Sequence, residues 1–189
     1  MTVFLALTVN IDRALCIVLI RIPAVCSLWR KNDAAHQSLA AQIAAHTAYR
    51  GYEAIVVGSV KDDTGTVDKP IARHKTDRKK MAIVEGGRDA ITHYTVIKRY
   101  NGYTYMAFQL ETGRTHQIRV HMASLSHPLL GDSIYGHEGF LGFDRAALHS
   151  FEITCQLPGH QDLAVFSGEM PEDFQKMIVE SKKLSSTLI

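Results

Sequence analysis

The segment from residue 110 to 121, Leu-Glu-Thr-Gly-Arg-Thr-His-Gln-Ile-Arg-Val-His, constrains the fold more than any other part of the chain. An alternating apolar stretch precedes it and an amphipathic stretch follows it, so it predicts a strand, a Thr-Gly turn and a helix. Four hydrogen-bonding side chains gather at this junction: Arg114, His116, Gln117 and Arg119. Arginine is favoured where a planar fork must meet a carboxylate or a phosphate. The solvated face of an ordinary helix would explain any one of these residues, but not the whole run.

Hydrophobic periodicity in the rest of the chain predicts an α+β domain. An Ala-rich pattern over 34–44, behind a capping Asn32 or Asp33, predicts a helix, and alternation over 49–60 predicts a strand. Asn101-Gly102 is a strong hairpin signal between two alternating stretches. We also expect a turn at 62–65, strands at 81–84, 145–156 and 163–166, and a closing helix at 171–183. Few helices around a central hairpin favour a mixed, mainly antiparallel sheet with flanking helices.

Composition limits the function without naming it. The net charge is only +2, so nucleic-acid binding would require a local basic patch. The cysteines, Cys16, Cys26 and Cys155, are odd in number and widely spaced, which indicates reduced thiols and a cytoplasmic location. The histidines lack HExxH or close ligand spacing, so we expect no metal; those considered are His116, His121, His127, His149 and His160.

The first 31 residues look foreign to the rest of the chain. They are apolar, but Asp12, Arg13 and Arg21 interrupt every long apolar run, and the stretch from Ala14 to Ile20 is far short of the ~20 residues of a membrane helix. A secretory signal would begin with cations, which this segment lacks. We therefore divide the chain into an aberrant segment over 1–31, a domain over 32–183 and a tail over 184–189.

A second run, His-Pro-Leu-Leu-Gly-Asp-Ser-Ile-Tyr-Gly over 127–136, comes after the first one. Together the two runs resemble the signature of pseudouridine synthases that modify structured RNA, the family that includes the large-subunit ribosomal RNA uridine synthases. The resemblance covers roughly Asn32 to Glu180, the C-terminal part of the family's catalytic domain. It implies the family's α+β fold, truncated at the N-terminus. It also implies isomerisation of uridine to pseudouridine without metal or organic cofactor. We expect structured, ribosomal RNA as the partner, no membrane, and a monomer.

The resemblance also implies roles for single residues. Tyr52, in Arg50-Gly51-Tyr52-Glu53-Ala54, matches the active-site tyrosine whose ring packs against the target base and whose hydroxyl is expected to take part in proton transfer. Arg119 matches the arginine that pairs with the catalytic aspartate. Without the family context, they read as a half-buried strand tyrosine and a surface arginine. Six further residues are expected to build the turn and the loop beside the site: Arg114, Thr115, His116, Gln117, Asp132 and Tyr135.

One basic run is a candidate contact for RNA phosphates, although such runs are usually solvated loops. It consists of Arg73, His74, Lys75, Arg78, Lys79 and Lys80, and Lys98 and Arg99 could extend it.

The family's nucleophile motif, His-Arg-Leu/Ile-Asp-x-x-Thr/Ser-Gly, does not occur in this chain, and residues 16–31 stand where it belongs. Residues 21–31 can be encoded so that a frame two nucleotides later reads Asp-Thr-Ser-Gly-Leu-Leu-Ile-Val-Ala-Lys, the tail of that motif. We therefore expect a frameshifted or misread gene. Only Asp12, Asp33 and Asp132 are conceivable substitutes, and none has the flanking residues of the family. Without the nucleophile, we expect Arg119 to turn to solvent or to a borrowed anion.

Three functions stay open at this point. The chain is a pseudouridine synthase that is active once the missing part is supplied, an inactive RNA-binding remnant of one, or a small protein-interaction domain. The two signature runs argue against the third.

Overall fold

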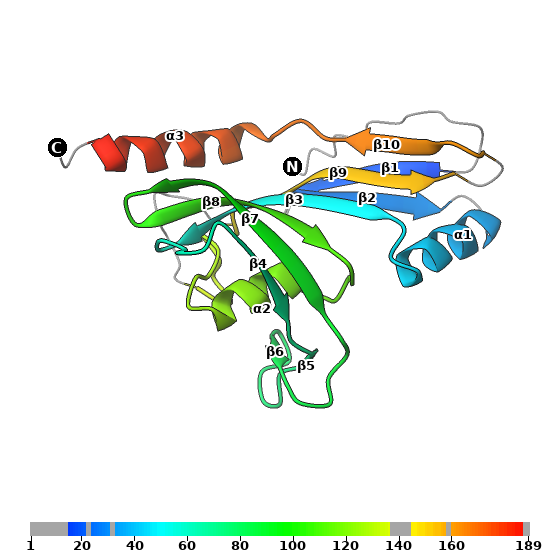
Figure 1. The fold of residues 1–189 in the computed structure, drawn as a ribbon, viewed down its shortest axis with the longest axis horizontal. Coiled ribbons are helices and arrows are strands. Elements are labelled where there is room, and N and C mark those ends of the chain that lie inside the picture. The colour runs from blue at the N-terminus through cyan, green and yellow to red at the C-terminus, as the bar shows by residue number, and fades with distance from the viewer. Residues whose placement is uncertain (1–14, 22–23, 31–32, 137–144, 158–159, 187–189) are drawn as a thin grey trace.

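The hairpin predicted around Asn101-Gly102 is present in the structure and belongs to its large sheet. Its strands are β7 (Ile91–Tyr100) and β8 (Tyr103–Leu110), and Gly102 takes the positive φ of 79° that the turn requires. The computed structural model describes residues 15–21, 24–30, 33–136, 145–157 and 160–186. Within them, one large sheet carries helices on both faces (Figure 1).

The large sheet has eight strands in the order β1-β2-β9-β3-β8-β7-β4, and β10 pairs with β9 outside this path. Its remaining strands are β1 (Leu15–Arg21), β2 (Ala24–Arg30), β3 (Tyr49–Val57), β4 (Thr64–Asp68), β9 (Leu148–Gln156) and β10 (Leu163–Ser167). All pairings are antiparallel except β2 with β9, which is parallel and meets at Ala24 and His149. A second, two-stranded sheet consists of β5 (Ile71–Arg73) and β6 (Met81–Ile83).

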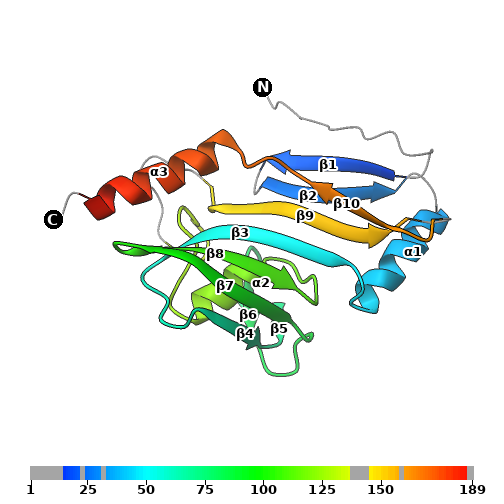
Figure 2. The ribbon, with the colours of Figure 1, turned by 45° about the horizontal axis from the view of Figure 1, so that its top comes forward.

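Three helices complete the described part: α1 (Asp33–Ala44), α2 (Gln117–Ser124) and α3 (Glu172–Ser186). Helix α2 lies below the large sheet next to the β5–β6 hairpin, whereas α3 lies above it (Figure 1). Turning the molecule shows β9 and β3 running side by side between the N-terminal hairpin and β8 (Figure 2). No described helix is long and apolar enough to cross a membrane.

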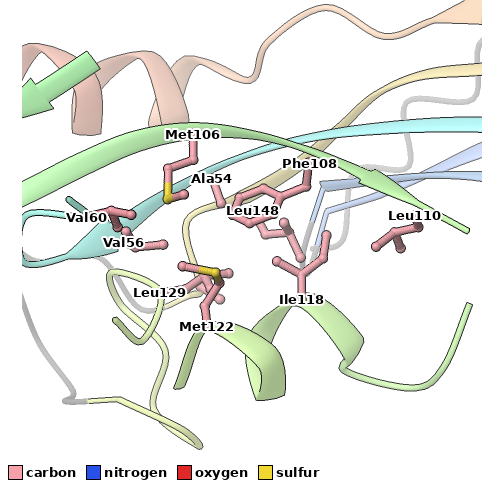
Figure 3. Packing of buried hydrophobic residues seen from close by; sticks show 11 residues of the cluster. Ala54, Val56, Val60, Met106, Phe108, Leu110, Ile118, Met122, Leu129 and Leu148 are labelled. Atoms are coloured by element: carbon pink, nitrogen blue, oxygen red, sulfur yellow. The ribbon is translucent and has the colours of Figure 1, made fainter. Parts of the chain in front are cut away.

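Alternation along β3 explains why both faces are covered. Ala54 and Val56 face α2 and pack in a cluster with Met106, Phe108, Ile118 and Met122 (Figure 3). Ile55, between them in sequence, points to the opposite face and packs against Phe174 and Met177 of α3. A strand buried on both faces must be apolar on both, which is what the centre of β3 provides.

The predicted fold class is confirmed, as are the helix before β3, the hairpin and the junction that leads into α2. The prediction of a turn at 62–65 was partly wrong, because β4 begins at Thr64 and pairs with β7 from Thr64 to Asp68. Pairing with a distant strand outweighed the local turn preference. Strand β5 was missed because its residues lead into the basic run and its pairing with β6 cannot be read from local pattern. Strand β9 begins at Leu148, later than expected, and α3 extends to Ser186.

The N-terminal segment also contains regular structure. Strands β1 and β2 form a hairpin that joins the sheet through β9. That residues 1–31 are aberrant remains a prediction, and residues 1–14, 22–23 and 31–32 lie outside the described part.

Candidate functional site

The junction between β8 and α2 is held by the side chain of Gln117, which is 3% exposed. Its Oε1 accepts hydrogen bonds from Thr112 Oγ1 at 2.8 Å and from the Arg114 amide at 2.9 Å. Its Nε2 donates to the Ile91 carbonyl and to Thr92 Oγ1, each at 3.0 Å. This glutamine therefore ties the turn, the helix start and strand β7 together.

Arg50 lies beneath the same turn. Its Nη2 donates to the carbonyls of Leu110 at 3.1 Å and Glu111 at 2.7 Å. A Cβ at Gly113 would lie 2.5 Å from Arg50 Nη1, so the glycine makes room for the guanidinium. Burial lowers the pKa of Arg50, with a further lowering by the nearby Arg114 and an opposing contribution from Tyr52. The sequence did not single out Arg50 as a functional residue, although it stands two positions before Tyr52 in the quoted motif.

Arg119 forms a two-pronged ion pair with Asp132. Its Nε donates to Oδ2 and its Nη2 to Oδ1, both at 2.7 Å. The side chains are 11% and 0% exposed. Asp132 Oδ1 also accepts the amides of Ile134 at 3.0 Å and Tyr135 at 3.1 Å. Burial alone would raise the pKa of Asp132, but the hydrogen bonds and charge of Arg119, with these two amides, lower it below 3.8. Arg119 thus does not turn to solvent; its anion belongs to the chain itself.

Tyr135 contacts both members of this pair. The Arg119 guanidinium lies 4.9 Å from the centre of the Tyr135 ring, in cation–π range. The hydroxyl accepts the Met81 amide at 2.7 Å and lies 2.9 Å from His116 Nδ1. Burial, followed by the charge of Arg119, lowers the pKa of His116, and Asp132 opposes this lowering. His116 stands in the left-handed region at φ 56° and turns its ring edge-on to Tyr135.

Tyr52 lies on the α2 side of the sheet. It is half-buried and packs against the cluster that contains Ile118, the neighbour of Arg119 in the helix. Across the ladder it faces Phe108 of β8 and Ser150 of β9. The hydroxyl oxygen of Ser150 is buried and has no hydrogen-bond partner in the described part of the chain. Tyr52 therefore packs against a cluster shared with the helix that carries Arg119, but that the two side chains line one cleft stays a prediction.

The β2 register brings the N-terminal hairpin near Tyr52. Ala24 pairs with His149, and the next residue of β9, Ser150, is the cross-strand partner of Tyr52. The middle of the region in which the nucleophile motif was sought, at Ala24, therefore lies two strands away from the candidate tyrosine.

The predicted basic residues lie on the loop that joins β5 to β6, called here the cationic loop (73–80). Arg73, Lys75, Arg78 and Lys79 are exposed, whereas His74 and Lys80 are half-buried. The loop is internally tied: His74 Nδ1 accepts the Asp77 amide at 3.1 Å, and Arg73 Nη1 donates to the Arg78 carbonyl at 2.7 Å. Among the described residues, none of its lysines or arginines forms a salt bridge. Most of its cations are thus available to an outside anion, whereas His74 serves the loop itself.

The second histidine of the motif, His121, is fully buried and structural. Its Nδ1 lies 2.9 Å from Thr92 Oγ1 and its Nε2 lies 3.0 Å from the Lys69 carbonyl. Burial is the main cause that lowers its pKa. In the described part of the chain, no three His, Cys, Asp or Glu side chains are grouped so as to hold a metal.

Comparison with known proteins gives one consistent result. The family model described as RNA pseudouridylate synthase matches residues 28–124, about half of the chain and a stretch that contains both Tyr52 and Arg119. An RNA pseudouridine synthase of Bacillus subtilis, named as uncharacterized YlyB, is 41% identical over 81% of this chain and 50% of its own length. Ribosomal large subunit pseudouridine synthase D of Pseudomonas aeruginosa is 40% identical over 76% of this chain and 49% of its own length. The chain thus spans about half the length of the curated relatives it matches.

Two solved human structures share the fold. One, RNA pseudouridylate synthase domain containing 4, superposes with a TM-score of 0.71 at 16% identity and covers 92% of each chain. The other, domain containing 1, has a TM-score of 0.69 at 21% identity and covers 86% of this chain and 82% of its own.

Proposed function

Because the chain belongs to the RNA pseudouridylate synthase family, we propose that its function is the isomerisation of uridine to pseudouridine in structured RNA. Ribosomal RNA is the proposed substrate, since several relatives at about 40% identity are named for the large ribosomal subunit. The observation that carries the proposal is that the family match contains both Tyr52 and Arg119, and that Tyr52 packs against the cluster that includes Ile118, the neighbour of Arg119 in α2.

The proposed roles follow the chemistry of the reaction. The cationic loop holds phosphates and positions the RNA without reading its sequence. The target uridine leaves its stack and enters the site at a cost of roughly a few kcal/mol, and the Tyr52 ring packs against it. An aspartate promotes cleavage of the bond between base and ribose. The detached uracil then rotates, and a bond from its C5 to ribose replaces the bond from its N1. The C5 proton is released and N1 takes up a proton, so the product is an isomer of the substrate.

The aspartate is the part that this chain does not supply. Asp132 is a poor substitute, because it is 0% exposed and its two oxygens accept four hydrogen bonds. Those bonds leave it neither accessible nor free to attack a ribose. This favours a second candidate function for the chain as it stands, an inactive RNA-binding remnant of the enzyme.

Tritium release from ribosomal RNA tests both candidates. We expect the chain to bind RNA without forming pseudouridine, and a version with the family motif restored in place of residues 16–31 to form it. Tyr52→Phe in the restored version keeps the ring and removes the hydroxyl that the resemblance assigns to proton transfer, so it should abolish turnover and leave RNA binding intact. RNA binding without turnover in the restored version would favour the remnant, and absence of both would refute the proposed function. Turnover by the unrestored chain would show that another carboxylate serves.

A further inference from the structure

Tyr135 joins two regions that the proposed function treats separately. Its hydroxyl accepts the amide of Met81 at 2.7 Å, and Met81 is the residue that comes directly after the cationic loop. Its ring lies 4.9 Å from the guanidinium of Arg119. Its own amide donates to Asp132, the partner of that guanidinium, at 3.1 Å. The Tyr135 side chain therefore contacts both the residue that follows the cationic loop and Arg119, the candidate site arginine.

The β5–β6 hairpin is packed on α2 through the same tyrosine. Ile71 and Val120 are buried together, and Met81, Ile83 and Tyr135 pack against them. Val120 is the neighbour of Arg119 in the helix. A displacement of the hairpin must therefore repack the contacts of Tyr135, because packed side chains transmit strain.

The cationic loop is tied closely enough to pass such a displacement on. The His74 amide donates to the Lys80 carbonyl at 3.0 Å, and Asp77 Oδ1 accepts the Lys79 amide at 2.9 Å. With these bonds across its base and its tip, a force on the exposed lysines reaches β6. A loop without internal bonds would absorb it.

We propose that Tyr135 is a positioning residue that couples RNA bound at the cationic loop to the orientation of Arg119. The inference rests on the proposed function and goes beyond it, because it makes occupancy of the loop a condition for the final geometry of the arginine. The path is short and specific: the Met81 amide to the Tyr135 hydroxyl, and the Tyr135 ring to the Arg119 guanidinium. Asp132 limits the movement to a shift of an ion pair that stays formed.

Tyr135→Phe separates coupling from packing. The ring and its contact with Arg119 remain, whereas the hydroxyl that accepts the Met81 amide and hydrogen-bonds to His116 is lost. Tyr103→Phe is the matched control, since Tyr103 packs on the opposite, α3-facing side of the sheet. The readout is the ¹⁵Nε signal of Arg119, recorded by NMR while a short RNA hairpin with uridines in its loop is added.

In the wild-type chain and in Tyr103→Phe, RNA should shift the Arg119 signal. Tyr135→Phe should bind the same RNA within about twofold, because no phosphate-binding cation is lost, but the shift should disappear. RNA binding by the wild-type chain without a shift would overturn the coupling and leave the proposed function standing. A shift that persists in Tyr135→Phe would also overturn it, by showing that RNA reaches Arg119 directly. Absence of RNA binding by the wild-type chain would overturn the proposed function, and the coupling with it.

Discussion

Asp132 holds Arg119 with both carboxylate oxygens, each at 2.7 Å, in a pair that is almost entirely withdrawn from water. The arginine expected to face a catalytic aspartate is thus already neutralised by a residue 13 positions further along the chain. The fold around α2 therefore does not depend on the missing motif for charge balance.

Replacing Asp132 should be costly. Asp132→Asn leaves Arg119 buried beside a neutral amide, and loss of one partner of a buried pair costs about 3–5 kcal/mol of unfolding free energy. Urea denaturation at neutral pH measures the loss, with Asp162→Asn at an exposed position as the control. Because the folded pKa of Asp132 lies below 3.8, its contribution is complete above that pH and is lost as pH falls below it. A loss no larger than that of Asp162→Asn would contradict the prediction.

Stability should also fall in mild acid. The pKa values of His116 and His121 are lowered from 6.5, chiefly by burial, so the unfolded chain takes up protons near pH 6.5 that the folded chain refuses. Stability is therefore complete above about pH 6.5 and declines as pH falls through it. Denaturant midpoints at about pH 7.5 and about pH 5 should show a smaller difference in His121→Gln than in the wild-type chain. The exposed-site variant His160→Gln should keep the full difference between the two midpoints. An equal difference in all three chains would refute the attribution of the acid sensitivity to His121.

The cationic loop should set the salt dependence of RNA binding. Alanine at Lys75, Arg78, Lys79 and Lys80 should weaken binding equally for all sequences, and the log–log salt slope should drop by roughly one unit per lost phosphate contact. Lys61 and Lys176, on other parts of the surface, provide a control in which the slope stays unchanged. An unaltered slope in the loop variant would mean that the loop is only a solvated surface.

Gly113→Ala should disturb the turn through Arg50. The added methyl group would meet Arg50 Nη1 at 2.5 Å, and Arg50 is fixed by two carbonyls. Overpacking of this kind costs about 1–3 kcal/mol. The cost should shrink when Arg50 is already replaced by Met, and a double-mutant cycle of unfolding free energies measures that difference. Additive losses would place the strain elsewhere.

The nucleotide sequence of the gene decides the frameshift hypothesis. Sequencing across codons 16–32 should recover an in-frame Arg-Leu/Ile-Asp ahead of Thr-Ser-Gly, or a shifted frame that encodes it. A verified transcript that encodes Ile22-Pro23-Ala24, with no such frame, would end the hypothesis.

Local signals predicted the elements that depend on local chemistry. The turn preference of Asn101-Gly102 located the hairpin, and the dense donors after Gly113 located the junction that Gln117 now holds. Pairings between residues distant in the sequence could not be predicted from these local signals. Nothing in the sequence shows that Asp132 meets Arg119, or that Thr64 begins a strand, because a partner elsewhere in the chain decides each. The same holds for Arg50, whose carbonyl partners lie about 60 residues away.

Strand β3 is paired on both sides by strands made much later, β8 through residues such as Phe108 and β9 through residues such as Ser150. During translation, β3 is synthesised before both of these partners. Its residues Ala54, Ile55 and Val56 are all 0% exposed in the folded chain. Its first edge stays unpaired until β8 emerges and its second until β9 is made, and its two apolar faces stay uncovered until α2 and α3 follow. Each nascent chain therefore carries an uncovered apolar strand for most of its synthesis, the kind of segment that aggregates or that chaperones shield.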